Sequence, residues 1–229
     1  MARTLNTDSE LRTPNCELRT YCRYCPVGAW FSLRMKLSFD NQDLPPEWHW
    51  HNEPEEWSIT NGCLVIQTEL TDFWQKTHYG FEKDDGHFLY CELKGDAVLR
   101  SKLTMLPQHQ YDQAGLMVRV NQDCWIKASL EFENPTLSRL GSVVTNFGYS
   151  DWSTQDCSPA IHELDLRITR TGPDYLIEFN KDGVWSQLRM THLHSEETTV
   201  QCGIYACSPV AIGFAPEFHF VEIDERLAE

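Results

Sequence analysis

The segment from residue 113 to residue 132 constrains the fold more than any other part of this sequence. It contains two runs, residues 113–120 and 125–132, in which apolar side chains alternate with other types on either side of a short polar turn. Successive side chains of a β-strand point to opposite faces, so this pattern predicts a hairpin with one dry face. The dry face would carry only Ala, Leu, Val, Ile and Phe side chains.

The opposite face of this hairpin differs from an ordinary solvent-exposed face, which would be mostly Thr, Lys, Glu and Ser. Its side chains are, in chain order, Gln113, Gly115, Met117, Arg119, Trp125, Lys127, Ser129 and Glu131. Amide, guanidinium, indole, ammonium and carboxylate groups are therefore gathered on one surface. We interpret this surface as the face of a sheet that holds a polar ligand.

Short strand-like runs separated by tight turns recur along the rest of the chain. Asn61-Gly62 lies between two such runs, which is the strongest short-range signal for a hairpin, and residues 180–183 (Asn-Lys-Asp-Gly) supply another turn. We predict about a dozen strands and no amphipathic helix, although an average globular protein is about one third helix. The expected strands are residues 57–60, 63–68, 88–93, 97–105, 113–120, 125–133, 142–146, 163–170, 175–179, 184–190, 201–207 and 218–223. This content predicts an all-β fold, a two-sheet antiparallel jelly-roll sandwich.

The charge balance excludes some classes of partner. The chain has 34 Asp and Glu residues against 19 Lys and Arg residues, a formal net charge of −15. Nucleic acids and anionic membranes both require a basic surface, so we expect neither as a partner. No apolar run is long enough to cross a bilayer, and the N-terminal segment has no apolar core of a secretory signal. Nine cysteines without such a signal indicate reduced thiols and a cytoplasmic location.

The first 28 residues differ in composition from the rest of the chain. They are polar, lack periodicity and end in a group of three cysteines, Cys16, Cys22 and Cys25. We expect residues 1–28 to be a disordered extension and residues 29–229 to form a single sandwich domain.

Six segments, in this order along the chain, resemble one known family. They are residues 72–80 (DFWQKTHYG), 111–119 (YDQAGLMVR), 125–127 (WIK), 142–145 (SVVT), 150–153 (SDWS) and 203–209 (GIYACSP). The sequence is similar to the regulation-of-enolase-type family of uncharacterised proteins, placed in the concanavalin A-like lectin/glucanase superfamily. This resemblance implies a sandwich of two curved sheets, one of them concave. It implies a context in sugar metabolism and no established activity.

The resemblance makes the concave sheet the expected binding face. Sugars are bound by aromatic faces and by planar groups that form paired hydrogen bonds. The expected ligand-binding residues are Gln113, Arg119, Trp125, Lys127 and Glu131 from the hairpin, with Trp74, Gln75 and Tyr79 from one loop and Tyr149, Asp151 and Trp152 from another. Alternatively, the three tryptophans pack in the core or at an edge, and Arg119 forms a cross-strand ion pair with Glu131.

A catalytic alternative rests on two glutamates of the hairpin. Glu131 and Glu133 would point to the same face about 6.5–7 Å apart, a spacing near that of inverting glycosidases. Together with Asp151 they could serve as an acid–base set of a glycoside hydrolase. Against this, glucanases of the superfamily carry Glu-x-Asp-x-(x)-Glu on one strand, whereas Glu133 runs directly into Asn134-Pro135.

The sequence gives weak signals for a metal. His49 and His51, and likewise His192 and His194, could each place two imidazoles on one strand face, but neither pair has an obvious third ligand beside it. The cysteines of the extension include one Cys-x-x-Cys pair without the fourth ligand of a structural zinc site. We therefore expect no metal and no cofactor.

These observations favour a non-catalytic, cytoplasmic protein that binds a carbohydrate or sugar metabolite. Gln113, Arg119, Lys127 and Glu131 would hydrogen-bond the ligand, while Trp125 and Trp152 stack on it. Arg119 and Lys127 together would favour an acidic or phosphorylated sugar. The alternatives are a regulatory module that binds a glycolytic enzyme and a glycoside hydrolase.

Overall fold

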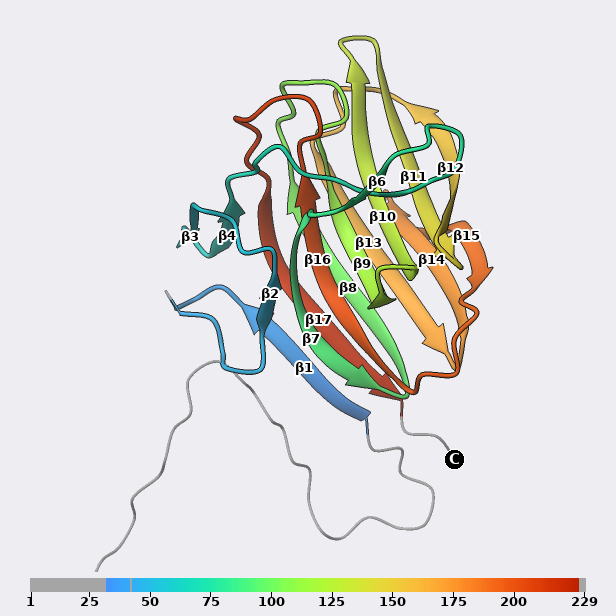
Figure 1. Ribbon diagram of the computed structural model, residues 1–229. Coiled ribbons are helices and arrows are strands. Elements are labelled where there is room, and N and C mark those ends of the chain that lie inside the picture. Colours follow the sequence, from blue (N-terminus) through green and yellow to red (C-terminus); the bar gives the residue numbers. More distant parts are fainter. Residues whose placement is uncertain (1–31, 42, 227–229) are drawn as a thin grey trace, which may run out of the picture.

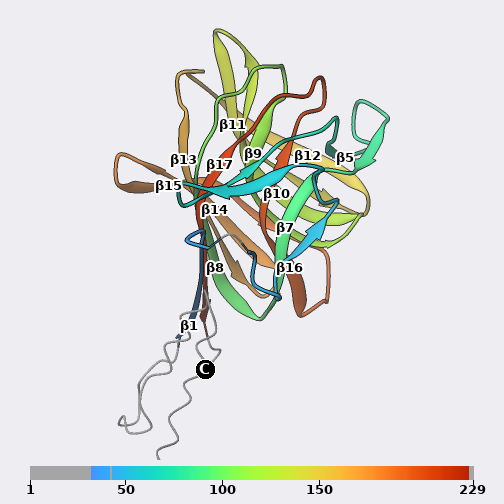
Figure 2. The ribbon, with the colours of Figure 1, turned by 90° about the vertical axis from the view of Figure 1, so that its left-hand side faces the viewer.

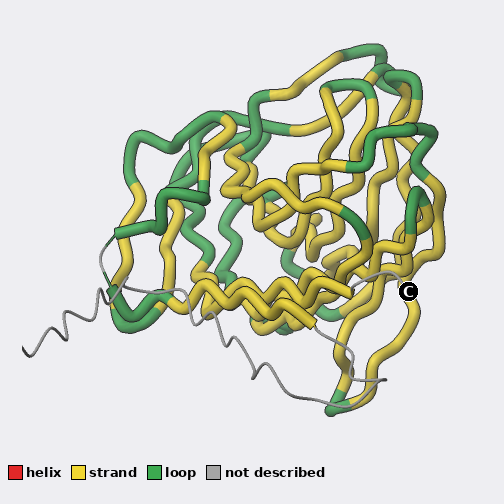
Figure 3. The backbone as a smooth tube through the Cα atoms, turned by 90° about the horizontal axis from the view of Figure 1, so that it is seen from below, coloured by secondary structure: helices red, strands yellow, loops and turns green. Residues whose placement is uncertain are grey.

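The computed structural model describes residues 32–41 and 43–226. All regular structure in these residues is β-strand, and Figure 3 shows only strands and loops there. No helix that could cross a bilayer occurs in this part of the chain. The extension with Cys16, Cys22 and Cys25 lies outside the described residues, so its state and the domain boundary remain predictions.

The described residues form seventeen strands, more than the sequence predicted. They are β1 (Ser32–Ser38), β2 (His49–His51), β3 (Trp57–Thr60), β4 (Cys63–Ile66), β5 (Phe73–Gln75), β6 (Glu82–Asp84), β7 (His87–Lys94), β8 (Asp96–Thr104), β9 (Gln113–Asn121), β10 (Cys124–Asn134), β11 (Leu137–Asn146), β12 (Tyr149–Cys157), β13 (Glu163–Thr171), β14 (Asp174–Lys181), β15 (Val184–His192), β16 (Thr199–Cys207) and β17 (Glu217–Arg226).

Fifteen of these strands form the two layers of a sandwich (Figure 1). The eight-stranded sheet has the order β15-β14-β13-β8-β17-β4-β3, with β1 also paired to β17, and the seven-stranded sheet has the order β12-β11-β10-β9-β16-β7-β2. All neighbouring strands are antiparallel. The predicted all-β, two-sheet jelly-roll sandwich is therefore confirmed.

The main core lies between the two sheets, and the β9–β10 hairpin supplies part of it. The alternating apolar side chains of this hairpin are at most 3% exposed there: Ala114, Leu116, Val118, Ile126, Ala128 and Leu130. The predicted dry face is confirmed at these six positions, whereas Val120 and Phe132 near the strand ends are only half-buried. The other face of the β9–β10 hairpin points away from this core, and we call this side the outer face of the seven-stranded sheet.

Two predicted hairpin turns are present. Asn61 and Gly62 have φ angles of 54° and 75°, and Asp182 and Gly183 have φ angles of 54° and 85°. Two successive positive φ values give the turn whose twist matches that of the flanking strands, and Asn-Gly and Asp-Gly adopt it most readily. These turns fix the registers of β3 with β4 and of β14 with β15.

A separate two-stranded sheet, β5–β6, lies outside the sandwich beside β12 (Figure 2). The sequence did not predict β5, β6 or β12, so Trp74, Asp151 and Trp152, expected in loops, lie on strands instead. β5 and β6 have only three residues each. β12 is an edge strand exposed at most of its positions, so it shows almost no apolar alternation.

Candidate functional site

Two cations of the seven-stranded sheet hold the β5–β6 hairpin over its outer face. Lys127 Nζ on β10 donates to the carbonyl oxygen of Phe73 (2.7 Å) and to Asp72 Oδ1 (3.3 Å). Arg119 Nη2 on β9 donates to Asp84 Oδ2 on β6 (2.7 Å). Each strand of the hairpin is thus tied to the sheet by a charge-assisted hydrogen bond, the stronger class of hydrogen bond in proteins.

The other end of β5 is held by β12. The backbone N–H of Gln75 donates to Ser150 Oγ (2.9 Å), and the Trp74 ring meets the Trp152 ring edge-on with centroids 6.5 Å apart. The hairpin is therefore fixed along its length and forms a permanent wall over the sheet.

Apolar and aromatic side chains fill most of the space under the hairpin. Each of these side chains is at most 7% exposed. They are Phe73, Trp74, Phe88, Met117, Trp125, Val143, Tyr205 and Cys207. We call this group the second core. The Lys127 ammonium lies 5.9 Å from the Trp125 ring centroid and 5.7 Å from that of Tyr205, so both π faces help to compensate its burial.

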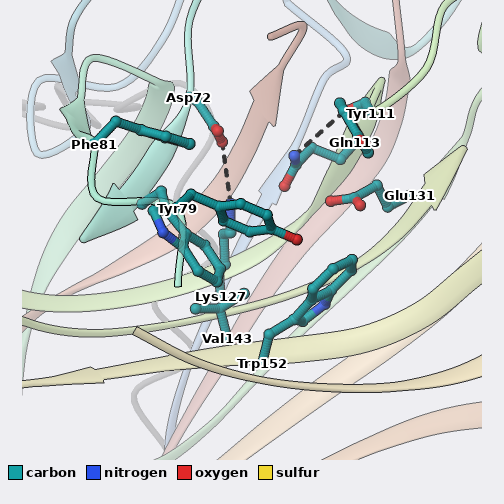
Figure 4. A pocket seen from close by; sticks show the side chains of 10 residues that line it. Asp72, Tyr79, Phe81, Tyr111, Gln113, Lys127, Glu131, Val143 and Trp152 are labelled. Atoms are coloured by element: carbon teal, nitrogen blue, oxygen red, sulfur yellow. Dashed lines mark hydrogen bonds and ion pairs between the residues drawn. The ribbon is translucent and has the colours of Figure 1, made fainter. Parts of the chain in front are cut away.

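A cavity of about 170 Å³ remains between the hairpin and the sheet (Figure 4). Its walls are five aromatic rings, one valine and four polar side chains. The lining residues are Asp72, Trp74, Tyr79, Phe81, Tyr111, Gln113, Lys127, Glu131, Val143 and Trp152. A mainly apolar surface with a few converging polar groups is typical of small-molecule sites.

The sheet register places a row of small residues between the long polar side chains of the outer face. On the outer face, the row Gly115, Ser129, Gly141 crosses β9, β10 and β11. The adjacent rows carry the long side chains of Glu131 and Lys127, which line the cavity. The glycine at 115 is required, because a Cβ there would lie 1.9 Å from the carbonyl oxygen of a neighbouring β10 residue.

The amide of Gln113 is held in a fixed orientation. Its Oε1 accepts a hydrogen bond from the Tyr205 hydroxyl (3.1 Å), and its Nε2 donates to the Tyr111 carbonyl oxygen (3.3 Å). Burial raises the pKa of Tyr205 well above its usual value, so this phenol stays neutral and remains a donor. Gln113 can still offer one N–H and one oxygen lone pair to a ligand.

Glu131 is the carboxyl group of the cavity without a hydrogen-bond partner among the described residues, and Figure 4 shows it pointing into the open space. Burial among the cavity walls raises its pKa to about 8, and the attraction of Lys127 opposes this only in part. At neutral pH the group is thus mainly a neutral acid that can donate a hydrogen bond as well as accept one.

The family assignment follows from comparison with known proteins. Residues 50–226, which include every lining residue of the cavity, match the family described as "Protein of unknown function (DUF1349)". The chain belongs to this family. It is also 33% identical to Regulation of enolase protein 1 of Saccharomyces cerevisiae over 171 residues, which cover 74% of this chain and 85% of that protein. The resemblance inferred from the six sequence segments is therefore confirmed.

Solved structures show the same architecture. A functionally unknown protein from Saccharomyces cerevisiae superimposes with a TM-score of 0.72 at 29% identity, covering 80% of this chain and 98% of that chain. The Bacteroides ovatus protein described as "Xyloglucan PUL GH43B" superimposes with a TM-score of 0.69 at 20% identity, covering 88% of this chain and 41% of that one. At such identity the second likeness concerns the fold alone.

Six of the eleven predicted ligand-binding residues line the cavity. They are Trp74, Tyr79, Gln113, Lys127, Glu131 and Trp152. Arg119 lies outside the cavity, bound to Asp84 and to Gln201 Oε1 (3.4 Å). Trp125 is completely buried in the second core, where its Nε1 donates to the Gln122 carbonyl oxygen (3.0 Å).

The alternative pairing of Arg119 with Glu131 is wrong. In the register of β9 with β10, Arg119 lies opposite Trp125, and Glu131 lies opposite Gln113. The two charged residues are at opposite ends of the pair of strands. The outer face of the β9–β10 hairpin therefore holds the β5–β6 hairpin at the end with Arg119 and borders the cavity at the end with Glu131.

The three acids of the hydrolase alternative are not gathered in the cavity. The strand register shifts between Phe132 and Asn134, and Glu133, at this irregularity, accepts a hydrogen bond from Arg139 Nε (2.8 Å). Asp151 is largely exposed on β12 and pairs with Arg189 (3.1 Å). Of the three, only Glu131 lines the cavity.

No cluster of three or more potential metal ligands occurs in residues 32–41 and 43–226. His192 and His194 lie close together, with ring centroids 4.9 Å apart, but His192 Nδ1 is bonded to Asp174 (2.7 Å). His51 Nε2 bonds to the carbonyl oxygen of Asp84 (2.8 Å). The groups that line the cavity can supply hydrogen bonds, aromatic stacking and, at Glu131, a proton.

Four lining residues were not predicted as ligand contacts: Asp72, Phe81, Tyr111 and Val143. Asp72, Tyr111 and Val143 all lie within segments that carry the family resemblance. Those segments were a usable signal for the site, because they lie far apart in the sequence and meet at the cavity. Phe81 directly follows one of them.

Proposed function

We propose that the cavity binds a neutral saccharide ring and that the protein is a non-catalytic carbohydrate-binding member of its family. The observation that supports this most is the Glu131 carboxyl group, which lines an aromatic cavity without a hydrogen-bond partner among the described residues. Trp152 and Tyr79 offer faces for the C–H patches of a sugar, while Gln113 and Glu131 offer paired donors and acceptors for its hydroxyl groups.

The charges of the cavity favour a neutral ligand over a phosphorylated one. Lys127 already donates to Asp72 and Phe73, so its charge is largely compensated by a carboxylate beside it. Arg119, the second cation once expected to attract an anion, is paired with Asp84 outside the cavity. A phosphate would meet the Asp72 carboxylate, and like charges in a partly desolvated site repel strongly.

A thermal-shift screen tests this proposal. Neutral monosaccharides, sugar phosphates and short oligosaccharides are added to the wild type, to Glu131→Ala and to Glu133→Ala. A ligand at a hundredfold excess over Kd stabilises the native state by about 2.7 kcal/mol, which is about 5–10 °C in Tm for a domain of this size. We expect neutral sugars to shift wild type and Glu133→Ala but not Glu131→Ala. If no saccharide shifts the wild type, the proposal is wrong.

A second candidate is a regulatory module that binds a glycolytic enzyme. Two observations favour it: the name of the yeast relative refers to enolase, and large aromatic side chains are exposed near the cavity. These are Tyr79, Phe81, Phe147 and Tyr149, between 43% and 72% exposed. Isothermal titration with purified enolase tests this candidate, and absence of heat at micromolar concentrations of both proteins counts against it.

A further inference from the structure

A second hollow lies directly beside the cavity, and we call it the groove. It is more open than the cavity, with a volume of about 590 Å³. Trp74, Tyr79 and Trp152 line both hollows. The two hollows therefore share part of their walls.

The groove has its own binding groups beyond the shared rings. Tyr149, on the edge strand β12, is 61% exposed and presents its ring to the groove, with Lys76 Nζ 5.6 Å from the ring centroid. Asp151 also lines it, oriented by Arg189 Nη2, which donates to Asp151 Oδ2 (3.1 Å) and leaves the other oxygen available. His78, in the turn after β5, contributes a further polar group.

The aromatic side chains follow one another from the cavity to the groove. Trp74 lies 5.4 Å from Tyr79 and 6.5 Å from Trp152, measured between ring centroids. Trp74 is only 7% exposed and packs against both other rings, so Tyr79 and Trp152 are the shared rings with surface accessible to a ligand in both hollows. A compact single ring would leave the groove unused, whereas a linear chain would use both hollows.

We propose that the ligand is a linear neutral oligosaccharide of at least two units, with one terminal unit in the cavity and the next in the groove. This inference rests on the proposed function, because it assigns the cavity to a sugar ring. It adds a second subsite in which Tyr149 stacks on the second unit and Asp151 accepts hydrogen bonds from its hydroxyl groups. The cavity is smaller and less open than the groove, so we assign the terminal unit to the cavity.

A chain-length series tests the inference. Isothermal titration is carried out with the one-, two-, three- and four-unit members of the β-1,4-linked xylose and glucose series and of the α-1,4-linked glucose series. The proteins are wild type, Tyr149→Ala and Phe147→Ala. Phe147 is the matched control, because it is an aromatic residue two positions from Tyr149, is 72% exposed and lines neither hollow.

We expect affinity to rise about tenfold from one unit to two, since one stacking contact and one hydrogen bond are gained. Tyr149→Ala should remove most of that gain and leave the affinity for one unit unchanged, while Phe147→Ala should behave like the wild type. Equal affinity for one and two units, or a gain that Tyr149→Ala preserves, would overturn the second subsite and leave the proposed function standing. Absence of binding at every length would overturn both.

Discussion

Replacement of Glu131 by glutamine should change how the stability of the protein depends on pH. The side chain borders the cavity, and burial raises its pKa from 4.5 to about 8. The native state therefore retains a proton that the unfolded chain releases at neutral pH. Glutamine has nearly the same shape as the protonated acid and does not titrate.

The sign of the effect follows from proton linkage. Between pH 4.5 and pH 8 the native state binds more protons at this group than the unfolded state, so the free energy of unfolding falls as the pH rises. The contribution of Glu131 is fully present below pH 4.5 and is lost as the pH rises through 8. The slope is at most about 1.4 kcal/mol per pH unit, which gives about 3 kcal/mol between pH 5.5 and pH 8.5.

Urea denaturation followed by tryptophan fluorescence measures this quantity. The free energy of unfolding is determined at pH 5.5, 6.5, 7.5 and 8.5 for the wild type, Glu131→Gln and Glu133→Gln. Other groups that titrate in this range are common to all three proteins, so they cancel in the difference between variant and wild type. We expect Glu131→Gln to gain about 3 kcal/mol relative to the wild type across the range, or about 6–12 °C in Tm.

The control separates a buried carboxyl from a paired one. Glu133 lies two residues along the same strand but is bonded to Arg139 and does not line the cavity. In Glu133→Gln the Glu131 carboxyl is still present, so the free energy of unfolding should still fall as the pH rises, by somewhat less than in the wild type because the Glu133 charge contributes to the raised pKa of Glu131. A constant difference between Glu131→Gln and the wild type from pH 5.5 to 8.5 would refute the claim that Glu131 is protonated in the native protein.

Three further outcomes are expected. Lys127→Met leaves Asp72 without its cationic partner under the hairpin and should lower the free energy of unfolding in urea by about 3–5 kcal/mol. The double variant Lys127→Met/Asp72→Asn should recover part of this loss. An equal loss in the single and the double variant would contradict the pairing. Gly115→Ala should destabilise by more than about 2 kcal/mol, because its Cβ would overlap a carbonyl oxygen of β10, and an unchanged Tm would show that the strands can separate there. In the native protein a thiol reagent should modify the partly exposed Cys63 and spare Cys207, which should react only after unfolding; peptide mapping of the labelled protein checks both sites.

The sequence predicted the sandwich well because its evidence is local. Strict alternation in residues 113–132 determines which side chains face the core, and the Asn-Gly and Asp-Gly turns determine the register of two hairpins. These signals depend on a strand and its immediate neighbour. The resemblance then identified the family, which the match over residues 50–226 confirms.

What covers the outer face could not be predicted, because it depends on contacts between distant segments. Alternation correctly placed Arg119, Trp125, Lys127 and Glu131 on one face. Nothing local indicates that a hairpin with three-residue strands docks on the first three of them and leaves the fourth free. The alternation shows only the direction of a side chain, whereas its role depends on what lies above it.

The way the outer face is filled bears on its function. Beneath the β5–β6 hairpin, the second core buries side chains as large as Trp125 and Tyr205, and the nearby acids Asp72 and Glu133 each have a cationic partner. A region built only for packing and ion pairing would also fill the cavity and pair Glu131. Here the cavity stays open and Glu131 has no cationic partner among the described residues, which lowers the free energy of unfolding at neutral and higher pH. The unpaired acid bordered by aromatic rings is the observation on which the proposed sugar site rests.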